Sequence, residues 1–560
     1  MFHKSISNIA QICALKGIKR AIISPGSRNA PLSISFYRHP KIECITINDE
    51  RSAAFIGVGM ALTSGLPTVL ICTSGSAAYN YAPAIAEAYF QHSPLLVLTA
   101  DRPPEWIDQL DGQTIRQNGI YGEHVKKSYQ APISLEHKDA EWHLYRLVSE
   151  AINSSSSYPQ GPVHINIPFR EPFYPGTDPI EYSEELKIIE SPVPKYISEE
   201  WNNQELLESW QKLSGKLIIA GQGLMDSELI KIVDQVSKKH SIPIISDVIS
   251  NFHAASKAIR HQDLFLTSEN NFLKPDLILS FGKSVISKNL KLFLRDNPPI
   301  EHWHIQPGGD SADTFQALTK TIYTEPKRFF KSLEESFPVI TNPIDSKWIE
   351  EDYKASNYIK GFIDKEELNE MMAINRVLLA IDKPVNLHLA NSMSVRYVNY
   401  LGITDPNIEV FCNRGTSGID GSTSTALGAA LNTPDKTNLL ITGDMAFFYD
   451  RNALWNPYLP DNLKILLINN HAGLIFGNIP GPSQLPKNEL EAIFEGHQPL
   501  TAELTAKEFG LKYALCKTIH KLDGHVHDFL SSNGPSILEI ETDKSLNKTF
   551  FKAFKESFKS

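Results

Sequence analysis

Apolar strand-like runs recur along this 560-residue chain, and each is followed by a segment of helical length. The runs include "TVLIC", "PLLVLTA" and "GPVHINIPF" in the first third, "KLIIA" and "DLILSF" in the middle, and "NLLIT" and "LKILLIN" in the last third. Unbroken Val/Ile/Leu runs that alternate with helices are typical of parallel sheets covered by helices on both faces. The pattern therefore predicts an α/β protein made of doubly wound parallel sheets.

Two stretches without apolar periodicity divide the chain. Residues 171–200 are rich in Pro, Glu and Tyr, and "FPVITNPIDSKWIEED" is a second stretch of this kind. We interpret both as linkers, which gives three α/β domains at 1–180, 200–340 and 365–556. A chain of this length is expected to hold three or four domains at roughly 100–200 residues each.

Composition excludes several classes of protein. The net charge of −10, with acidic residues spread along the chain, argues against a broad nucleic-acid footprint. No apolar run approaches the roughly 20 residues of a membrane span, and the N-terminus resembles an amphipathic helix rather than a signal peptide. The five cysteines are scattered without CxxC spacing, so neither a disulfide framework nor a zinc site is indicated. We expect a cytoplasmic protein.

A polar pair of strand ends is the strongest chemical signal. "LLITGD" ends in Asp444, and the next apolar strand, "LKILLIN", leads into Asn470. Ligands collect at the carboxyl ends of parallel strands, and carboxylate and amide oxygens suit Mg²⁺ when phosphate oxygens complete the shell. Ordinary Asp/Asn turns also follow strands, so the motif alone leaves both readings open. By contrast "GQG" at 221–223 lacks the third glycine of a dinucleotide fingerprint, and we interpret it as a tight turn.

"NDERSAAFIGVGMAL" places Glu50 directly before an apolar helix. An acidic residue there can simply satisfy free N–H groups and suit the helix dipole. However, the step from Gly443-Asp444 to Asn470 resembles the cofactor motif of thiamine-diphosphate enzymes. That resemblance implies that Glu50 hydrogen-bonds the aminopyrimidine ring and promotes the tautomer that activates the thiazolium carbon.

Four longer sequence motifs indicate one particular family among the thiamine-diphosphate enzymes. "SPGSRNAPL", "TADRPPE", "QTIRQ" and "NRGTSGIDG" occur together and in order. The chain resembles the 2-succinyl-5-enolpyruvyl-6-hydroxy-3-cyclohexene-1-carboxylate synthases of menaquinone biosynthesis over nearly its whole length. The resemblance implies a pyrimidine-binding domain at 1–180, a central domain at 200–340 and a diphosphate-binding domain at 365–556. It also implies decarboxylation of 2-oxoglutarate and 1,4-addition of the succinyl carbanion to isochorismate.

Both implied substrates are dicarboxylates, which the planar fork of arginine binds with two hydrogen bonds. An isolated arginine is more often a surface charge, but four arginines stand on matched strings that we expect to be loops at strand ends. The substrate-binding residues implied are Ser27, Arg28, Arg102, Gln113, Lys288, Arg396 and Arg414.

The remaining site residues also come from the resemblance. Cofactor contacts are implied for Glu50, Asn391, Ser392, Ser417, Gly418, Ile419, Asp444, Asn470, Ile475 and Phe476. The metal, Mg²⁺ with Mn²⁺ as an alternative, would be held by Asp444, Asn470 and the backbone carbonyl of Ala472. Relatives have glycine at the position of Ala472, and His471 is a further departure that we interpret as a loop residue rather than a proton shuttle.

The resemblance implies a homodimer or a dimer of dimers, because the two cofactor-binding surfaces of this superfamily meet between subunits. Two alternatives remain open at this point. Another thiamine-diphosphate carboligase or decarboxylase, such as an acetolactate synthase, would not need several carboxylate-binding arginines. A non-catalytic cofactor-binding protein would be expected to lack Glu50 or the pair Asp444 and Asn470, and all three are present.

Overall fold

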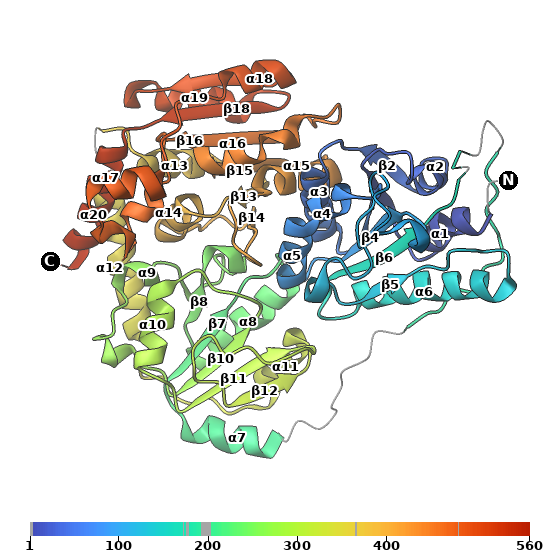
Figure 1. Ribbon diagram of the computed structural model, residues 1–560. Coiled ribbons are helices and arrows are strands. Elements are labelled where there is room, and N and C mark those ends of the chain that lie inside the picture. The colour runs from blue at the N-terminus through green and yellow to red at the C-terminus, as the bar shows by residue number, and fades with distance from the viewer. Residues whose placement is uncertain are drawn as a thin grey trace.

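The protein was analysed as a computed structural model, which describes residues 4–171, 173–174, 179–191, 203–363, 367–479 and 481–559. Three six-stranded sheets lie one after another along the chain, and every strand pair in them is parallel. Helices cover both faces of each sheet (Figure 1). The predicted fold class is therefore confirmed, while residues 192–202, which include the end of the first predicted linker, lie outside the described residues.

The N-terminal sheet has the strand order β2-β1-β3-β4-β6-β5. Its strands are β1 (Arg20–Ile23), β2 (Glu43–Thr46), β3 (Thr68–Cys72), β4 (Leu95–Asp101), β5 (Ser128–Gln130) and β6 (Pro162–Pro168). Its helices are α1 (Lys4–Leu15), α2 (Ala30–Tyr37), α3 (Glu50–Ser64), α4 (Ser76–Asn80), α5 (Ala82–Gln91) and α6 (Lys138–Ser156).

The middle sheet has the order β12-β11-β10-β7-β8-β9. Its strands are β7 (Lys216–Ala220), β8 (Ile244–Ser246), β9 (Ala258–Ile259), β10 (Leu277–Phe281), β11 (Glu301–Gln306) and β12 (Lys320–Tyr323). Its helices are α7 (Asn203–Lys212), α8 (Ser227–His240), α9 (Gln262–Phe265), α10 (Lys288–Asp296) and α11 (Pro326–Ser336).

The C-terminal sheet has the order β14-β13-β15-β16-β18-β17. Its strands are β13 (Val385–Leu389), β14 (Ile408–Phe411), β15 (Thr437–Gly443), β16 (Leu463–Asn469), β17 (Lys512–Cys516) and β18 (Ser536–Glu541). Its helices are α13 (Glu370–Leu379), α14 (Met393–Leu401), α15 (Ser422–Asn432), α16 (Asp444–Asp450), α17 (Lys487–Glu489), α18 (Glu503–Phe509), α19 (Ile519–Ser531) and α20 (Lys544–Lys559). Numbered within its own domain, this order is the same as that of the N-terminal sheet, so the two domains share one topology.

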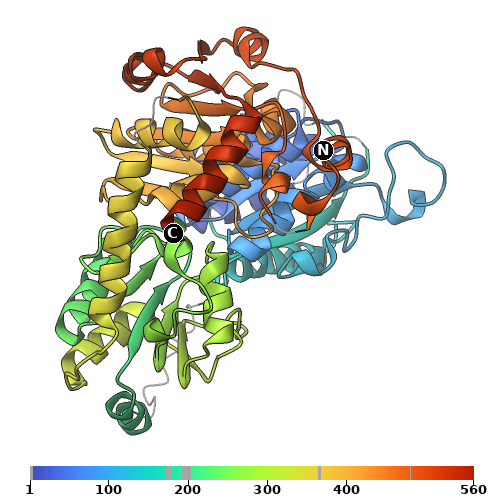
Figure 2. The same cartoon turned by 90° about the vertical axis from the view of Figure 1, so that its left-hand side faces the viewer.

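The prediction of a second linker is wrong for the later half of its segment, residues 345–352. Helix α12 (Asp345–Ile363) begins inside it and runs between the middle and C-terminal domains (Figure 2). Trp348, Ala355 and Ile359 lie on one face of α12 and are buried, and the indole of Trp348 packs edge-on against Phe265 and Phe293. Charged residues dominate the rest of the segment, which hides this apolar face when the sequence is read locally.

Helices α3 and α15 join the N-terminal and C-terminal domains through very close backbone contact. A Cβ atom added to Gly428 would lie 2.0 Å from the carbonyl oxygen of Ile56, and one added to Gly59 would lie 2.0 Å from that of Thr425. Glycine therefore permits an approach that any other residue would block. One apolar core spans both helices and continues into both sheets, so the two domains form one packed unit.

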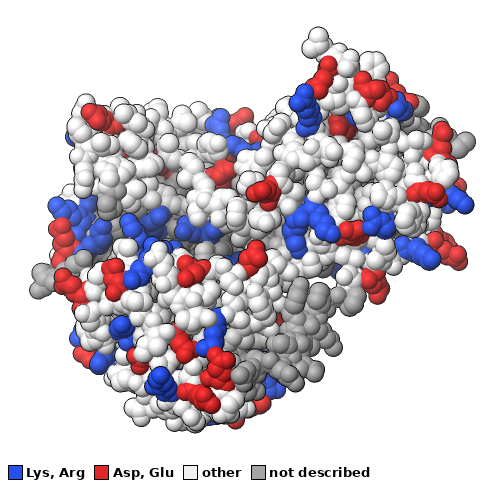
Figure 3. Space-filling view, turned by 60° about the horizontal axis from the view of Figure 1, so that its bottom comes forward, with Lys and Arg blue, Asp and Glu red and all other residues white. Residues whose placement is uncertain are grey.

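The described helices and the distribution of charge on the surface match the expectations from the composition. No described helix is long and apolar enough to cross a bilayer. Both signs of charge are interspersed over the face in Figure 3, with several basic side chains in a band across its middle. Helix α20 is amphipathic, and it packs Phe551 and Phe554 into the C-terminal domain.

We expect Gly428→Ala to destabilise the protein although alanine is the better helix former. Overpacking a tight contact costs roughly 1–3 kcal/mol or more, and the gain in helix propensity is at most about 1 kcal/mol. The matched control is Gly524→Ala in the interior of α19, where an added Cβ meets no atom within 4 Å. Thermal unfolding should show a lower midpoint for Gly428→Ala and an equal or higher one for Gly524→Ala. A Gly428→Ala midpoint at or above wild type would contradict the packing argument.

Candidate active site

A cavity of about 380 Å³ opens at the carboxyl edge of the C-terminal sheet. Eleven residues singled out from the sequence line it, and they are Asn391, Ser392, Arg396, Arg414, Ser417, Ile419, Asp444, Asn470, Ala472, Ile475 and Phe476. They come from four chain segments that follow β13, β14, β15 and β16. The fold therefore brings together residues up to about 85 positions apart in the sequence, as the strand-end argument predicts.

The predicted metal ligands lie at the ends of two adjacent strands. Gly443 of β15 is in register with Ile468 of β16, so Asp444 and Asn470 follow the strands at the same edge. The Asp444 carboxylate accepts hydrogen bonds from the Met445 N–H at 2.9 Å and from Gln498 Nε2 at 2.8 Å. The Asn470 Oδ1 atom accepts the Ala472 N–H at 2.9 Å, which forms a tight turn after β16.

A buried glutamate that the sequence motifs did not single out orients Asn470. Glu370, the first residue of α13, is 2% exposed, and its carboxylate accepts a hydrogen bond from Asn470 Nδ2. With the amide nitrogen directed to Glu370, Oδ1 is the Asn470 atom that remains to bind a cation. Burial raises the pKa of Glu370 to about 7, and the bond from Asn470 opposes this rise. Burial likewise raises the pKa of Asp444, and a bound cation would act in the opposite direction.

Asn391 ties two of the lining loops together. Its Nδ2 donates to the carbonyl oxygens of Asn413 and Gly418, both at 2.7 Å, while its Oδ1 accepts from Arg414 Nη1 at 2.9 Å. Ser417 has a positive φ of 62°, and the side chain of Ile419 is 38% exposed although it is apolar. The loop thus presents a bare apolar side chain into the cavity beside polar groups.

Two guanidinium groups share this cavity. Arg396 donates to the carbonyl oxygen of Ser392 and Arg414 to Asn391, and Arg414 Nε is buried without a partner. Among the described residues neither arginine forms an ion pair with a carboxylate. Burial lowers the pKa of Arg396, and the neighbouring Arg414 lowers it further. Arg396 lies inside helix α14 and not on a strand-end loop as expected, because α14 begins three residues earlier at Met393.

The predicted residues of the N-terminal domain form a separate group. Ser27 and Arg28 follow β1, Glu50 follows β2, and Arg102 follows β4, all at the carboxyl edge of that sheet. None of them lines the cavity described above, nor does Gln113, which is exposed and has a φ of 57°.

Within that group the two arginines already have partners. Arg28 is buried, packs over the Phe173 ring and donates to the Phe169 carbonyl oxygen. Arg102 forms an ion pair with Asp111 at 3.1 Å. Glu50 accepts a long hydrogen bond of 3.5 Å from Asn80.

Glu50 starts helix α3, and its two neighbours face the far end of α16. Asp49 accepts from Asn452 at 2.8 Å, and Arg51 donates to the Tyr449 carbonyl oxygen. Asp49 also caps α3 through the N–H groups of Arg51 and Ser52. The capping role that position alone suggested for Glu50 therefore belongs to Asp49, which leaves the Glu50 carboxylate available for another partner.

Lys288, predicted to bind substrate, is exposed at the start of α10 and does not line the cavity. Lys291, one turn further on, was not singled out from the sequence. Burial lowers the pKa of Lys291, the charge of Asp247 opposes this change, and the charge of Arg414 adds to it. Lys291 Nζ donates to the Val285 carbonyl oxygen at 2.7 Å, and the residue lines a neighbouring cavity of about 350 Å³ instead of this one. No local sequence signal distinguishes the two lysines, because only the packing of α10 decides which one turns inward.

Comparisons with known proteins identify the family of the chain. Residues 6–125 match the thiamine pyrophosphate enzyme N-terminal TPP-binding domain, residues 190–388 the middle domain, and residues 392–540 the C-terminal TPP-binding domain. The 2-succinyl-5-enolpyruvyl-6-hydroxy-3-cyclohexene-1-carboxylate synthase of Cytophaga hutchinsonii is 47% identical over 99% of both chains. The chain belongs to this synthase family. It is therefore a thiamine-diphosphate-dependent enzyme of the transferase type.

More distant synthases show the same coverage. The protein of the same name from Flavobacterium johnsoniae is 39% identical, over 98% of this chain and 97% of the relative. The one from Bacteroides thetaiotaomicron is 35% identical over 99% of both. Thiamine diphosphate is thus the cofactor, and the resemblance found in the sequence is confirmed at the level of the family.

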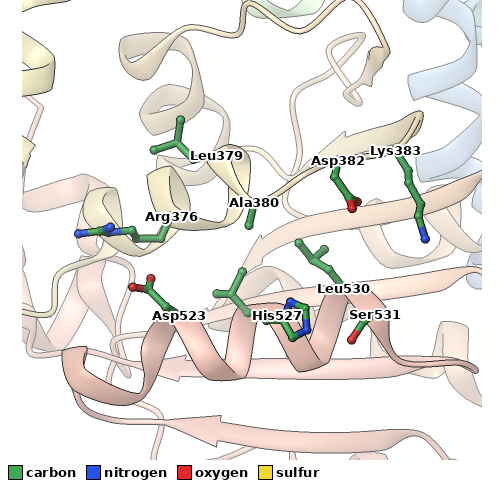
Figure 4. Close-up of a pocket in the computed structure, with 10 residues that line it drawn as sticks. Arg376, Leu379, Ala380, Asp382, Lys383, Asp523, His527, Leu530 and Ser531 are labelled. Atoms are coloured by element: carbon green, nitrogen blue, oxygen red, sulfur yellow. The ribbon is translucent and has the colours of Figure 1, made fainter.

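A second, smaller cavity of about 290 Å³ lies between α13 and α19. Arg376 and Lys383 come from the α13 side, and Asp523 and His527 project from α19 (Figure 4). It contains none of the residues predicted from the sequence. Of these two cavities, only the larger one is lined by the residues for which the sequence predicts cofactor contacts.

The larger cavity suits a metal-bound diphosphate. Asp444 and Asn470 offer side-chain oxygens, and the Ala472 carbonyl lies in the same turn, where it accepts the Leu474 N–H at 3.0 Å and keeps a second lone pair. The described residues contain no cluster of three or more His, Cys, Asp or Glu side chains that could hold a metal. The predicted donor set is therefore one carboxylate, one amide and one carbonyl, which leaves room for phosphate oxygens.

We expect Glu370→Ala to weaken Mg²⁺-dependent binding of thiamine diphosphate by roughly 10–100-fold, the usual effect of removing a group that orients a metal ligand. Glu370→Gln keeps an acceptor for Asn470 Nδ2 and should lose less. Calorimetric titration of cofactor at fixed Mg²⁺ measures both variants, and thermal unfolding checks that they are folded. Equal affinities for wild type and Glu370→Ala would show that Asn470 needs no support from Glu370.

Proposed function

We propose that this enzyme decarboxylates 2-oxoglutarate and adds the resulting succinyl unit to isochorismate, a step of menaquinone biosynthesis. The products are 2-succinyl-5-enolpyruvyl-6-hydroxy-3-cyclohexene-1-carboxylate and CO₂. The relatives carry the name of this product. The observation that carries the proposal is the pair of half-buried arginines, Arg396 and Arg414, that line the cavity without an ion-paired carboxylate among the described residues.

Half-buried arginines without an ion-paired carboxylate leave donors free to bind an anion, and the Arg414 Nε–H is one such donor. A dicarboxylate would supply that anion, and the planar fork of each arginine would fix its orientation. Lys291 adds a third positive charge nearby. Asp263 is the carboxylate that most raises the pKa of Arg396. Its oxygens already accept hydrogen bonds from Ser287, Asn289 and Asn399. These contacts support a substrate with more than one carboxylate.

Cofactor and metal would occupy the larger cavity. Asn391, Ser392, Ser417 and Gly418 would contact the cofactor through polar groups, and Ile419, Ile475 and Phe476 would form its apolar support. Asp444, Asn470 and the Ala472 carbonyl would hold Mg²⁺, with Mn²⁺ as an alternative, against the diphosphate. When bound, thiamine diphosphate supplies a carbon nucleophile and stabilises the carbanion left by loss of CO₂.

Glu50 would exchange a proton with the aminopyrimidine ring of the cofactor. Its carboxylate is not used for helix capping, but in one chain it does not line the cavity that holds Asp444. A second copy of the chain could bring its N-terminal domain, with Glu50, Ser27, Arg28, Arg102 and Gln113, against this cavity. We therefore propose a homodimer, or a dimer of dimers, with active sites shared between chains and with Lys288 at the substrate entrance.

The cytoplasm is the proposed location. All five cysteines are free, and burial raises the pKa of each of them. Buried protonated thiols of this kind persist in a reducing compartment.

An alternative is another carboligase of the superfamily that acts on a simpler 2-oxoacid such as pyruvate. A substrate with a single carboxylate would leave at least one of the two cavity arginines unpaired. The same argument disfavours a non-catalytic cofactor-binding protein, which has no need of arginines beyond those that contact phosphate.

Incubation with thiamine diphosphate, Mg²⁺, 2-oxoglutarate and isochorismate should yield a product with the mass of isochorismate plus succinic semialdehyde, together with one CO₂ per product. Asp444→Ala is the matched control, and we expect no product from it because the metal is lost. Chelation of Mg²⁺ in the wild-type enzyme should have the same effect.

Substituting pyruvate for 2-oxoglutarate separates the alternatives. We expect turnover of pyruvate to be lower by about 10²-fold or more, since a missing partner leaves a buried polar group unpaired. Faster use of pyruvate than of 2-oxoglutarate would favour the simpler carboligase instead.

A further inference from the structure

Glu87 lies in α5 of the N-terminal domain. Its carboxylate accepts hydrogen bonds from the loop of the C-terminal domain that lines the cavity. Its Oε1 accepts the Gly415 N–H at 2.7 Å, and its Oε2 accepts both the N–H and the hydroxyl of Thr416, each at 2.7 Å. Glu87 is 1% exposed, although it is acidic. Three short hydrogen bonds to one buried carboxylate are strong, because the acceptor is charged and solvent does little to screen that charge.

The loop approaches α5 too closely for any side chain at one position. A Cβ atom on Gly415 would lie 2.5 Å from the Glu87 carbonyl oxygen and 2.9 Å from the Gln91 nitrogen. The residue before it is also held, since the Arg414 N–H donates to Gln91 Oε1 at 3.0 Å. Three consecutive loop residues, 414–416, are therefore attached to α5.

The middle domain supports the same contact. Lys283 donates to the Gln91 carbonyl oxygen, and Gln222 donates to the carbonyl oxygen of Cys412 at 2.9 Å. Burial lowers the pKa of Lys283 to about 8, and the charge of Glu87 opposes this change. Lys283 N–H donates to the Gln222 carbonyl oxygen at 2.9 Å, so Lys283 and the "GQG" turn together form a junction at which all three domains meet.

The residues held at this junction lead directly into the part of the loop that lines the cavity. Arg414 directs its guanidinium to Asn391, and Ser417 and Ile419 follow within five residues. Ser417 has a positive φ, a backbone conformation that costs energy for a residue other than glycine. A loop with such a residue needs external bonds to keep one conformation.

We propose that Glu87 is a positioning residue that sets loop 414–419 for cofactor and substrate binding. This inference rests on the proposed function of that loop. Glu87 does not line the cavity, so it acts through Gly415 and Thr416. Its role goes beyond holding two domains together.

Glu87→Gln is the direct test. One carboxylate oxygen becomes an NH₂ group, which would face an N–H donor of the loop and repel it. We expect the dissociation constant of thiamine diphosphate and the KM for 2-oxoglutarate to rise roughly tenfold or more, the effect of losing a charge-assisted bond in a buried place. The matched control is Asn432→Ala, which removes bonds to Arg20 and Thr63 across the same two domains but far along α15 from the loop. That variant should change the melting temperature while leaving both constants within about twofold of wild type.

Gly415→Ala provides a second route if Glu87→Gln does not fold. The added methyl group pushes the loop from α5 without altering any charge, so it should raise the same two constants. Wild-type constants in a folded Glu87→Gln, or in Gly415→Ala if Glu87→Gln does not fold, would overturn the positioning role. So would equal changes in the Asn432→Ala control. An inactive wild-type enzyme in the same assay would instead overturn the proposed function, so the two failures are distinguishable.

Discussion

Helices α3 and α15 touch at a separation that only glycine permits. The arrangement of the active site depends on this contact. Gly59 and Gly428 let the two helices approach until backbone atoms touch, and one apolar core then runs through both outer domains. Each helix begins at a functional segment: Glu50 starts α3, and the cavity loop leads into α15. The helix contact therefore fixes the position of both segments at once.

The two outer domains use the same strand order for related tasks. In each sheet the predicted site residues follow the first, second and fourth strands, and the predicted metal ligand Asp444 follows the third strand of the C-terminal sheet. In a single chain these two edges do not form one cavity. This separation is what the proposed function explains by a second copy of the chain that brings the two edges together.

Local sequence was sufficient for the parallel sheets and for the strand-end pair Asp444 and Asn470, because apolar runs and spacing are local properties. Glu370 and Glu87 were not found this way. Each is an ordinary acidic residue in a helical pattern, and its importance arises from partners 100 and more than 300 positions away. Helix α12 was missed for a similar reason, since the value of burying Trp348 depends on Phe265 and Phe293.

Subunit complementation tests the shared active site most directly. Glu50→Gln and Asp444→Ala chains, each inactive alone, would be unfolded or dissociated together and reassembled as a 1:1 mixture. If sites form between chains, half of the dimers are mixed and each has one intact site, so activity should recover to about a quarter of wild type. Reassembled wild type sets the scale. No recovery, with mixed dimers demonstrated by mass spectrometry, would show that Glu50 and Asp444 act within one chain.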